Sequence, residues 1–311
     1  MSAFPVPVKA RRSKNRIFVR AVVVLLALCV AGLLAIGWQA STKAIHPAAA
    51  RHRGLDQFPA LHAAQGVTIH SRTGADLAAT FFAGSKRAAV ILSHGYGDNQ
   101  NQMLPYAEFL NRDGFSVLIY DMRNRGRSTG DAVTLGALEQ TDLISAVDYI
   151  TSRPEIDTNR IGALGVSLGG SATLLAAAAD PRIKAVVDDS GFSDAPNVIE
   201  TSFEHFIGLP AFPFAPITVQ MVRLRTGIDA NTIRPMDVAG RISPRPLLVI
   251  HCMEDKVVPP DNSDRNFAAA REPKQFWRVP SGGHIAAFKV ARDEYERRVT
   301  RFFEDNLLSK N

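Results

Sequence analysis

The sequence has little cysteine, and this scarcity excludes several kinds of protein. Its two cysteines, Cys29 and Cys252, lie far apart in separate apolar runs. They make neither a disulfide framework nor a metal motif, and no cysteine and histidine residues are grouped at zinc spacing. A phosphate-binding glycine loop and internal repeats are also missing. We therefore expect no metal and no cofactor.

The excess of basic over acidic residues is confined to the N-terminus. The chain carries 36 Lys and Arg against 30 Asp and Glu, a net charge of +6. Six basic residues and no acid precede residue 21, namely Lys9, Arg11, Arg12, Lys14, Arg16 and Arg20. Because these six account for the whole excess, the rest of the chain is neutral. We therefore expect no nucleic-acid partner.

One segment behind this basic stretch is free of charge and long enough to cross a membrane. Residues 21–38 contain no charged side chain, and in helical form they would span roughly 27 Å. Since basic flanks stay on the cytoplasmic side, we predict a basic cytoplasmic tail at 1–20 and a single transmembrane anchor at 21–38, with Trp38 at the far interface. A linker at 39–65 would then lead to an extracytoplasmic domain at 66–311.

A cleaved signal peptide is the alternative explanation of the apolar segment. No small-x-small cleavage site follows it closely, because Trp38 occupies the −3 position before Ala40 and the alanines at 48–50 lie far downstream. The pair Arg11-Arg12 lacks the hydrophobic residue that a twin-arginine signal has shortly afterwards. We favour an uncleaved anchor, with secretion after cleavage as the alternative.

Beyond the linker, segments typical of strands alternate with segments typical of helices. Short apolar runs predict buried strands at 88–93, 115–120, 161–166, 183–187, 247–252 and 275–279. Helices are predicted at 103–112, 138–152, 168–179, 262–270 and 285–308. Segments 66–70 and 77–82 predict an antiparallel hairpin. This alternation predicts an α/β fold with a mostly parallel central sheet and helices on both faces.

Residues from about 195 to 240 interrupt this alternation. Phe203, Phe206, Phe212 and Phe214 are interleaved with prolines, and a short helix is predicted at 219–224. The segment is too long for an ordinary connection. We predict a cap insertion over the substrate site, with its rings facing the pocket or the core. A peripheral helical excursion is the alternative.

The stretch Gly165-Val166-Ser167-Leu168-Gly169 joins a predicted buried strand to an Ala- and Leu-rich predicted helix. A strand that turns directly into a helix leaves no room for side chains two positions before and after the turn residue, and Gly165 and Gly169 relieve that clash. The turn presents Ser167 at the carboxyl end of the sheet, beside the positive end of a helix. We predict that Ser167 is a nucleophile.

Two more polar residues follow later predicted strands, Asp255 after 247–252 and His284 after 275–279. The carboxyl ends of parallel strands meet at one crevice. We predict that His284 takes the proton of Ser167, that Asp255 orients the imidazole, and that the backbone N–H groups of Tyr96 and Leu168 form the oxyanion hole.

The identity of the acid stays open at this stage. Asp255 is preferred because its strand adjoins the unit that bears the histidine, but Glu254, Asp261, Asp188 and Asp189 are alternatives. His94 lies on the predicted oxyanion loop, and we expect it to be structural.

Residues 66–308 resemble the α/β-hydrolase superfamily, and within it the bacterial serine hydrolases that include the serine aminopeptidase-like and Bem46-like esterases. The motifs that carry the resemblance are His94-Gly95-Tyr96-Gly97, Asp121-x-Arg123-x-x-Gly126-x-Ser128-x-Gly130, Gly165-x-Ser167-x-Gly169, Asp255-x-x-Val258-Pro259 and Gly283-His284. The resemblance implies the fold and the triad, and it spans esterases, lipases, thioesterases, peptidases and inactive members.

We therefore predict a membrane-anchored serine hydrolase that cleaves a carboxylic ester through an acyl-enzyme on Ser167. Its substrate would be a small-molecule ester or acyl compound, and the aromatic cap favours an apolar acyl chain. A peptidase is one alternative, for which Glu200 and Glu204 are the candidates to bind a substrate amine. A non-catalytic binding module on the same fold is another.

Overall fold

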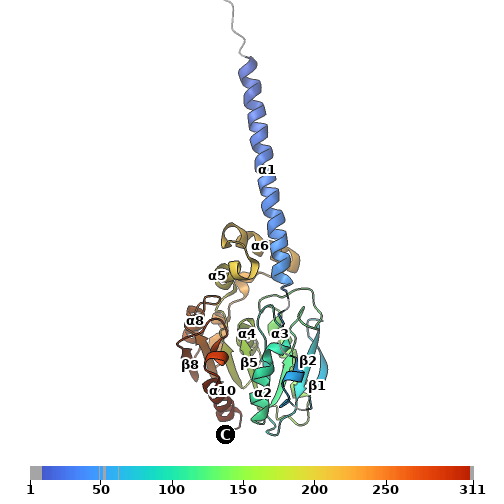
Figure 1. The fold of residues 1–311 in the computed structure, drawn as a ribbon, viewed down its shortest axis with the longest axis vertical. Coiled ribbons are helices and arrows are strands. Elements are labelled where there is room, and N and C mark those ends of the chain that lie inside the picture. Colours follow the sequence, from blue (N-terminus) through green and yellow to red (C-terminus); the bar gives the residue numbers. More distant parts are fainter. Residues whose placement is uncertain (1–8, 49, 52–53, 62, 309–311) are drawn as a thin grey trace, which may run out of the picture.

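The computed structural model describes residues 9–308 except 49, 52–53 and 62, so parts of the predicted tail (1–8) and of the predicted domain (309–311) lie outside the described residues. An eight-stranded sheet forms the centre of the described chain (Figure 1). Its strands are β1 (Gln65–His70), β2 (Asp76–Phe82), β3 (Ala89–Ser93), β4 (Ser116–Tyr120), β5 (Ile161–Val166), β6 (Ala185–Asp189), β7 (Leu247–Cys252) and β8 (Lys274–Val279).

The strand order is β1-β2-β4-β3-β5-β6-β7-β8. Strand β2 pairs antiparallel with β1 and β4, and all other neighbours are parallel. Every residue of β3 to β7 is buried, as apolar strands covered on both faces must be. The predicted mostly parallel sheet and its leading hairpin are confirmed.

Helices cover both faces of the sheet. On one face, α2 (Leu104–Arg112) and α10 (Arg292–Leu307) pack with the aromatic side chains of Phe109, Tyr295 and Phe303. On the other face, α3 (Glu139–Thr151) and α4 (Leu168–Ala179) share a second cluster, joined by residues from α7 (Pro235–Val238) and α8 (Asp261–Ala269). The sheet therefore lies between two apolar layers.

The predicted terminal helix at 285–308 is two helices. The short helix α9 (Ala287–Val290) ends at Ala291, whose dihedral angles (φ −139°, ψ 48°) are not helical. Helix α10 then begins with Asp293 and Glu294 in its first turn, where acidic side chains stabilise the positive end of a helix.

The cap consists of α5 (Ala195–Ile207) and α6 (Ala211–Thr226), followed by short turns of 3₁₀ helix at Ala230–Thr232 and Ala239–Arg241 on either side of α7. Helix α6 is longer than the helix predicted at 219–224. Phe212 has extended dihedral angles (φ −96°, ψ 133°), so the regular helix begins after it. Pro213 and Pro216 then fall in its first turn, where backbone N–H groups have no intrahelical partner and proline is tolerated.

Helix α1 (Lys9–Ile45) projects from the domain beside the cap (Figure 1). It continues past Trp38, so residues 39–45 of the expected linker are helical. Small side chains let it approach the cap, because a Cβ atom at Gly37 would overlap Ile217 of α6. Ala40 and Ile45 are buried, so the end of this helix is part of the folded domain.

Among the described helices, the stretch Asn15–Ile45 of α1 is long and apolar enough to cross a membrane. A membrane anchor and a signal sequence both fit this property. Helices α5 and α6 meet the same test only as a pair, and they are bent by 103° relative to each other.

Candidate active site

Ser167 occupies the turn between β5 and α4 with a positive φ of 54° (ψ −121°). The two flanking glycines make this turn possible. A Cβ atom at Gly165 would overlap the carbonyl of Gly169, and a Cβ atom at Gly169 would overlap the carbonyl groups of Ser93 and His94. A non-glycine residue with positive φ is uncommon, and here the conformation is imposed by a strand that passes directly into a helix.

Ser167, His284 and Asp255 form one chain of hydrogen bonds. His284 Nε2 lies 2.7 Å from Ser167 Oγ, and His284 Nδ1 lies 2.7 Å from Asp255 Oδ2. A carboxylate only accepts, so Nδ1 carries the hydrogen and Nε2 is free to accept the hydroxyl hydrogen of Ser167. This arrangement can deprotonate a serine as it attacks a carbonyl carbon.

Both carboxylate oxygens of Asp255 have polar partners. Its Oδ1 accepts hydrogen bonds from the backbone N–H groups of Val257 (2.8 Å) and Val258 (3.0 Å). Its Oδ2 also lies 3.2 Å from Nε2 of the buried His251. Burial by itself raises the pKa of Asp255, but the hydrogen bonds from His251, His284 and Val258 outweigh it and hold the pKa well below its usual range. The carboxylate therefore stays ionised beside the imidazole.

The alternative acids have other partners. Asp188 Oδ1 accepts from Gly191 N–H at 3.1 Å, and Asp189 accepts from the hydroxyl groups of Ser190 (2.8 Å) and Tyr295 (2.9 Å). Glu254 accepts from Gly282 N–H at 3.0 Å, and Asp261 pairs with Arg265 at 3.2 Å. Among these acids, Asp255 is the one that accepts the hydrogen bond of His284 Nδ1.

The loop after β3 contains the expected oxyanion donor Tyr96 and the buried His94. His94 Nδ1 donates to the carbonyl of Gly95 (2.8 Å), and its Nε2 accepts from Met122 N–H (3.0 Å). Both ring nitrogens are thus used to hold the loop in place. Burial lowers the pKa of His94, so the ring stays neutral in this role.

Tyr96 and Leu168 adjoin Ser167 at an open pocket of about 960 Å³, its mouth included, which both of them help to line. Leu168 is the first residue of α4, and N–H groups in the first turn of a helix have no intrahelical partner. The structure thus places both expected oxyanion residues in the lining of the pocket that Ser167 also lines.

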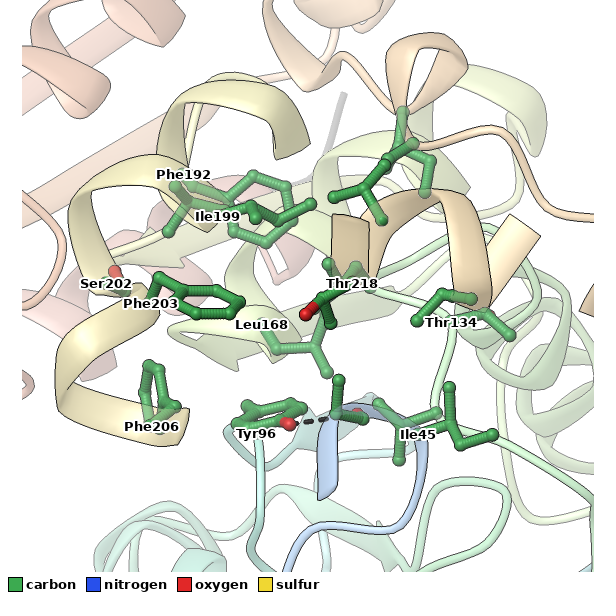
Figure 2. Close-up of a pocket in the computed structure, with 18 of the residues that line it drawn as sticks. Ile45, Tyr96, Thr134, Leu168, Phe192, Ile199, Ser202, Phe203, Phe206 and Thr218 are labelled. Carbon is green, nitrogen blue, oxygen red and sulfur yellow. Dashed lines mark hydrogen bonds between the residues drawn. The ribbon is translucent and has the colours of Figure 1, made fainter. Parts of the chain in front are cut away.

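The pocket is apolar. The described residues that line it are hydrophobic or carry a hydroxyl group, and none is charged. Phe203 and Phe206 of α5 line one side, and Figure 2 shows Tyr96 between Phe206 and the end of α1. The rings of Tyr96 and Phe206 make an edge contact with centroids 4.9 Å apart.

The cap phenylalanines divide into three groups. Phe203 is buried and Phe206 is 39% exposed, and both line the pocket. Phe214 packs with Ala40 and Ala215 in a small cluster between α1 and the cap. Phe212, expected to face the pocket or the core, is instead 85% exposed, because its extended backbone places it before the regular part of α6. Glu200 and Glu204 are also exposed and do not line the pocket.

Several pocket residues were absent from the sequence-based prediction, and Ala44 and Ile45 at the end of α1 are among them. The hydroxyl of Tyr96 donates to the carbonyl of Ala44 at 2.9 Å (Figure 2). A sequence signal does exist: Gly37, Ala40 and Ala44 place small residues at helical spacing, a pattern that favours close helix packing. It lies in the stretch that we had assigned to a linker.

The sheet order, the serine at the strand-to-helix turn and the hydrogen-bonded histidine and aspartate define an α/β-hydrolase. Solved structures share this fold. The Pyrococcus furiosus esterase Pf2001 aligns with a TM-score of 0.70 and 21% identity, over 84% of this chain and 99% of the esterase. The Porphyromonas gingivalis dipeptidyl peptidase 4 aligns with a TM-score of 0.61 and 21% identity, over 78% of this chain and 35% of the peptidase.

The chain belongs to the prolyl oligopeptidase family, whose model matches residues 101–310. Among curated proteins, the uncharacterized protein YfhR of Escherichia coli O157:H7 is 28% identical over 79% of this chain and 78% of its own length. The uncharacterized protein YqkD of Bacillus subtilis is 28% identical over 70% of this chain and 71% of its own length. The names of these two relatives assign no substrate.

Proposed function

We propose that this protein is a membrane-anchored serine hydrolase that cleaves carboxylic esters through an acyl-enzyme on Ser167. The observation that carries the proposal is the continuous chain of hydrogen bonds from Ser167 through His284 to the buried Asp255, at an apolar pocket.

In the first half of the reaction, Ser167 Oγ bonds to the acyl carbon and its proton passes to His284 Nε2. The negative oxygen of the tetrahedral intermediate accepts hydrogen bonds from the N–H groups of Tyr96 and Leu168, each commonly contributing about 2.7–4 kcal/mol. The bond to the alcohol oxygen then breaks, and His284 gives its proton to the departing alcohol. Water, deprotonated by His284, repeats the sequence and releases the acid.

We further propose that residues 21–38 remain as an uncleaved membrane anchor. The basic residues at 1–20 would stay in the cytoplasm and the hydrolase domain of residues 66–311, with its cap at about 195–240, would lie outside it. The burial of Ala40 and Ile45 against the domain supports this choice, because signal cleavage downstream of residue 45 would remove part of the pocket wall.

A peptidase is the second candidate, and the family match favours it. Against it, Glu200 and Glu204 are exposed and do not line the pocket, and none of the described lining residues is a carboxylate that could bind a substrate amine.

The test is labelling by a fluorophosphonate, which reacts with activated serines. The wild-type protein should be labelled on the peptide that contains Ser167 and should hydrolyse a chromogenic acetate ester. Both signals should vanish in Ser167→Ala. An unlabelled wild-type protein that is fully folded would instead indicate a non-catalytic binding module.

A further inference from the structure

The end of α1 joins the proposed anchor to the pocket. Ala44 and Ile45 line the same pocket as Ser167, and they follow without a break from the apolar part of the helix. The helix that carries the proposed anchor therefore also forms part of the pocket wall. A segment that served only as a flexible tether would not need this contact.

Polar contacts fix this junction. Arg225 of α6 donates to the hydroxyl groups of Ser41 (2.7 Å) and Thr42 (2.8 Å), and its guanidinium lies 4.6 Å from the centre of the Trp38 ring. On the other side, Asn124 Nδ2 and Val133 N–H both donate to the carbonyl of Ile45, at 2.7 and 2.9 Å. The helix end is thus bonded to the cap and to the body of the domain.

The cap contacts α1 at the end of its apolar part. Ile217 of α6 meets Gly37, and Arg225 covers Trp38. Tryptophan and arginine together are typical of the boundary between lipid and water. If residues 21–38 span the bilayer, α6 therefore lies at the membrane surface.

The cap also exposes apolar side chains beside the helix. Phe212 is 85% and Leu224 is 77% exposed on α6. The part of α1 that meets the cap exposes Leu34, Ile36 and Trp38, so both α1 and the cap present apolar side chains. A monomer in water rarely exposes such surface without a partner, and here the bilayer is the partner adjacent to it.

We propose that the pocket takes its substrate from the bilayer, as the acyl chain of a membrane-resident ester that enters beside α1 and α6. This proposal rests on the proposed function and names its substrate class. The chain would lie against Ala44, Ile45 and the cap, with its carbonyl carbon at Ser167. Hydrolysis consumes one water, and it gives a fatty acid and the alcohol to which the acid was esterified.

The test uses the full chain in phosphatidylcholine vesicles, with 4-methylumbelliferyl oleate in the bilayer and 4-methylumbelliferyl acetate in the water. Ala44→Trp fills the pocket from the anchor side and should lower the oleate-to-acetate ratio of kcat/KM by about tenfold, the effect of roughly two displaced methylenes. Ala35→Trp makes the same change at an exposed position of α1 and should keep the wild-type ratio. An unchanged ratio in Ala44→Trp overturns the proposal.

Two further measurements complete the design. If Ala44→Trp loses cooperative thermal unfolding, the smaller Ala44→Leu is judged by the same ratio. Doubling the phosphatidylcholine in the same vesicles, at fixed protein and ester, should halve the oleate rate at low ester, because the ester is diluted within the bilayer. A rate that follows the bulk ester concentration contradicts delivery from the membrane. Failure of the proposed function is separate, since it would abolish acetate hydrolysis and labelling of Ser167 in the wild type.

Discussion

The body of the domain and its cap are built in different ways. In the body, β3 to β7 are wholly buried, and buried charges such as Arg123 and Asp142 are paired with each other. In the cap, α5 and α6 share only a small cluster with α1, formed by Ala40, Phe203, Ile207 and Ala215. The cap also leaves large apolar side chains in solvent.

This difference separates two tasks. Ser167, Asp255 and His284 follow β5, β7 and β8, so their geometry depends on the central sheet. The pocket, which we propose binds the acyl chain, is lined in large part by α1, α5 and α6. We therefore expect changes in the body to act on all substrates alike, and changes in the cap to act according to acyl length.

The largest effect should come from the nucleophile and the base. Ser167→Ala and His284→Ala should each lower kcat for any ester on the order of 10⁴- to 10⁶-fold, because the members of a triad act as a unit. Steady-state kinetics on acetate and octanoate esters, with thermal unfolding beside them, measures this. The exposed Ser152 and His70 provide controls: Ser152→Ala and His70→Ala should retain activity. Substantial turnover by Ser167→Ala would assign the chemistry to another group.

The next effect concerns the acid. Asp255→Asn should lower kcat by on the order of 10³- to 10⁴-fold, because the amide no longer holds the imidazole in the required tautomer. The neighbouring Glu254 is exposed, and Glu254→Gln should remain active. Wild-type turnover in Asp255→Asn would move the orienting role to Asp188, Asp189 or Glu254.

A pair of phenylalanines compares body and cap directly. Phe109 is fully buried against Phe288 and Tyr295, so Phe109→Ala should cost about 3–5 kcal/mol in the free energy of unfolding. Phe206 is 39% exposed at the pocket, so Phe206→Ala should cost about 1 kcal/mol or less in the free energy of unfolding. The same variant should slow the cleavage of long-chain esters more than that of acetate. Denaturant unfolding and the acyl-length profile measure both. Equal losses on all esters in Phe206→Ala would place its ring in the core.

The last effect is a pH dependence inside the body, which alters stability and not turnover. Burial is the main reason that the pKa of Asp188 rises to about 7, with Asp189 adding to the rise and with His251, Gly191 N–H and Asn266 opposing it. The folded state holds a proton that the unfolded state has lost, so this group's contribution to stability should fall by up to about 1.4 kcal/mol per pH unit between pH 4 and 7. Asp188→Asn should remove that slope. Parallel stability curves for wild type and variant over this range would contradict the assignment.

The sequence was informative where structure is determined locally. Apolar runs such as 161–166 located the buried strands, and the glycines around Ser167 identified the turn because no other residue fits there. The positions of Asp255 and His284 after successive strands predicted that their side chains would meet. These inferences depend on short stretches of chain and on the known geometry of parallel sheets.

The cap and the end of α1 were predicted less well, since tertiary contacts decide them. Helix α6 accommodates Pro213 and Pro216 because Phe212 is extended, which no local pattern shows. Residues 39–45 are helical where Ser41 and Thr42 bond to Arg225, which is far away along the chain. A linker was expected there because the strongly apolar run ends at Trp38.

The measurement that tests the account most directly is an acyl-length profile of the wild-type protein. Chromogenic esters from acetate to dodecanoate would be compared by kcat/KM, with peptide amides beside them. We predict that kcat/KM rises with chain length, by a free energy of at most about 0.8 kcal/mol per methylene, until the pocket is full. A flat profile, or faster cleavage of the peptide amides, would contradict an ester hydrolase with an acyl pocket and would favour a small-ester hydrolase or a peptidase.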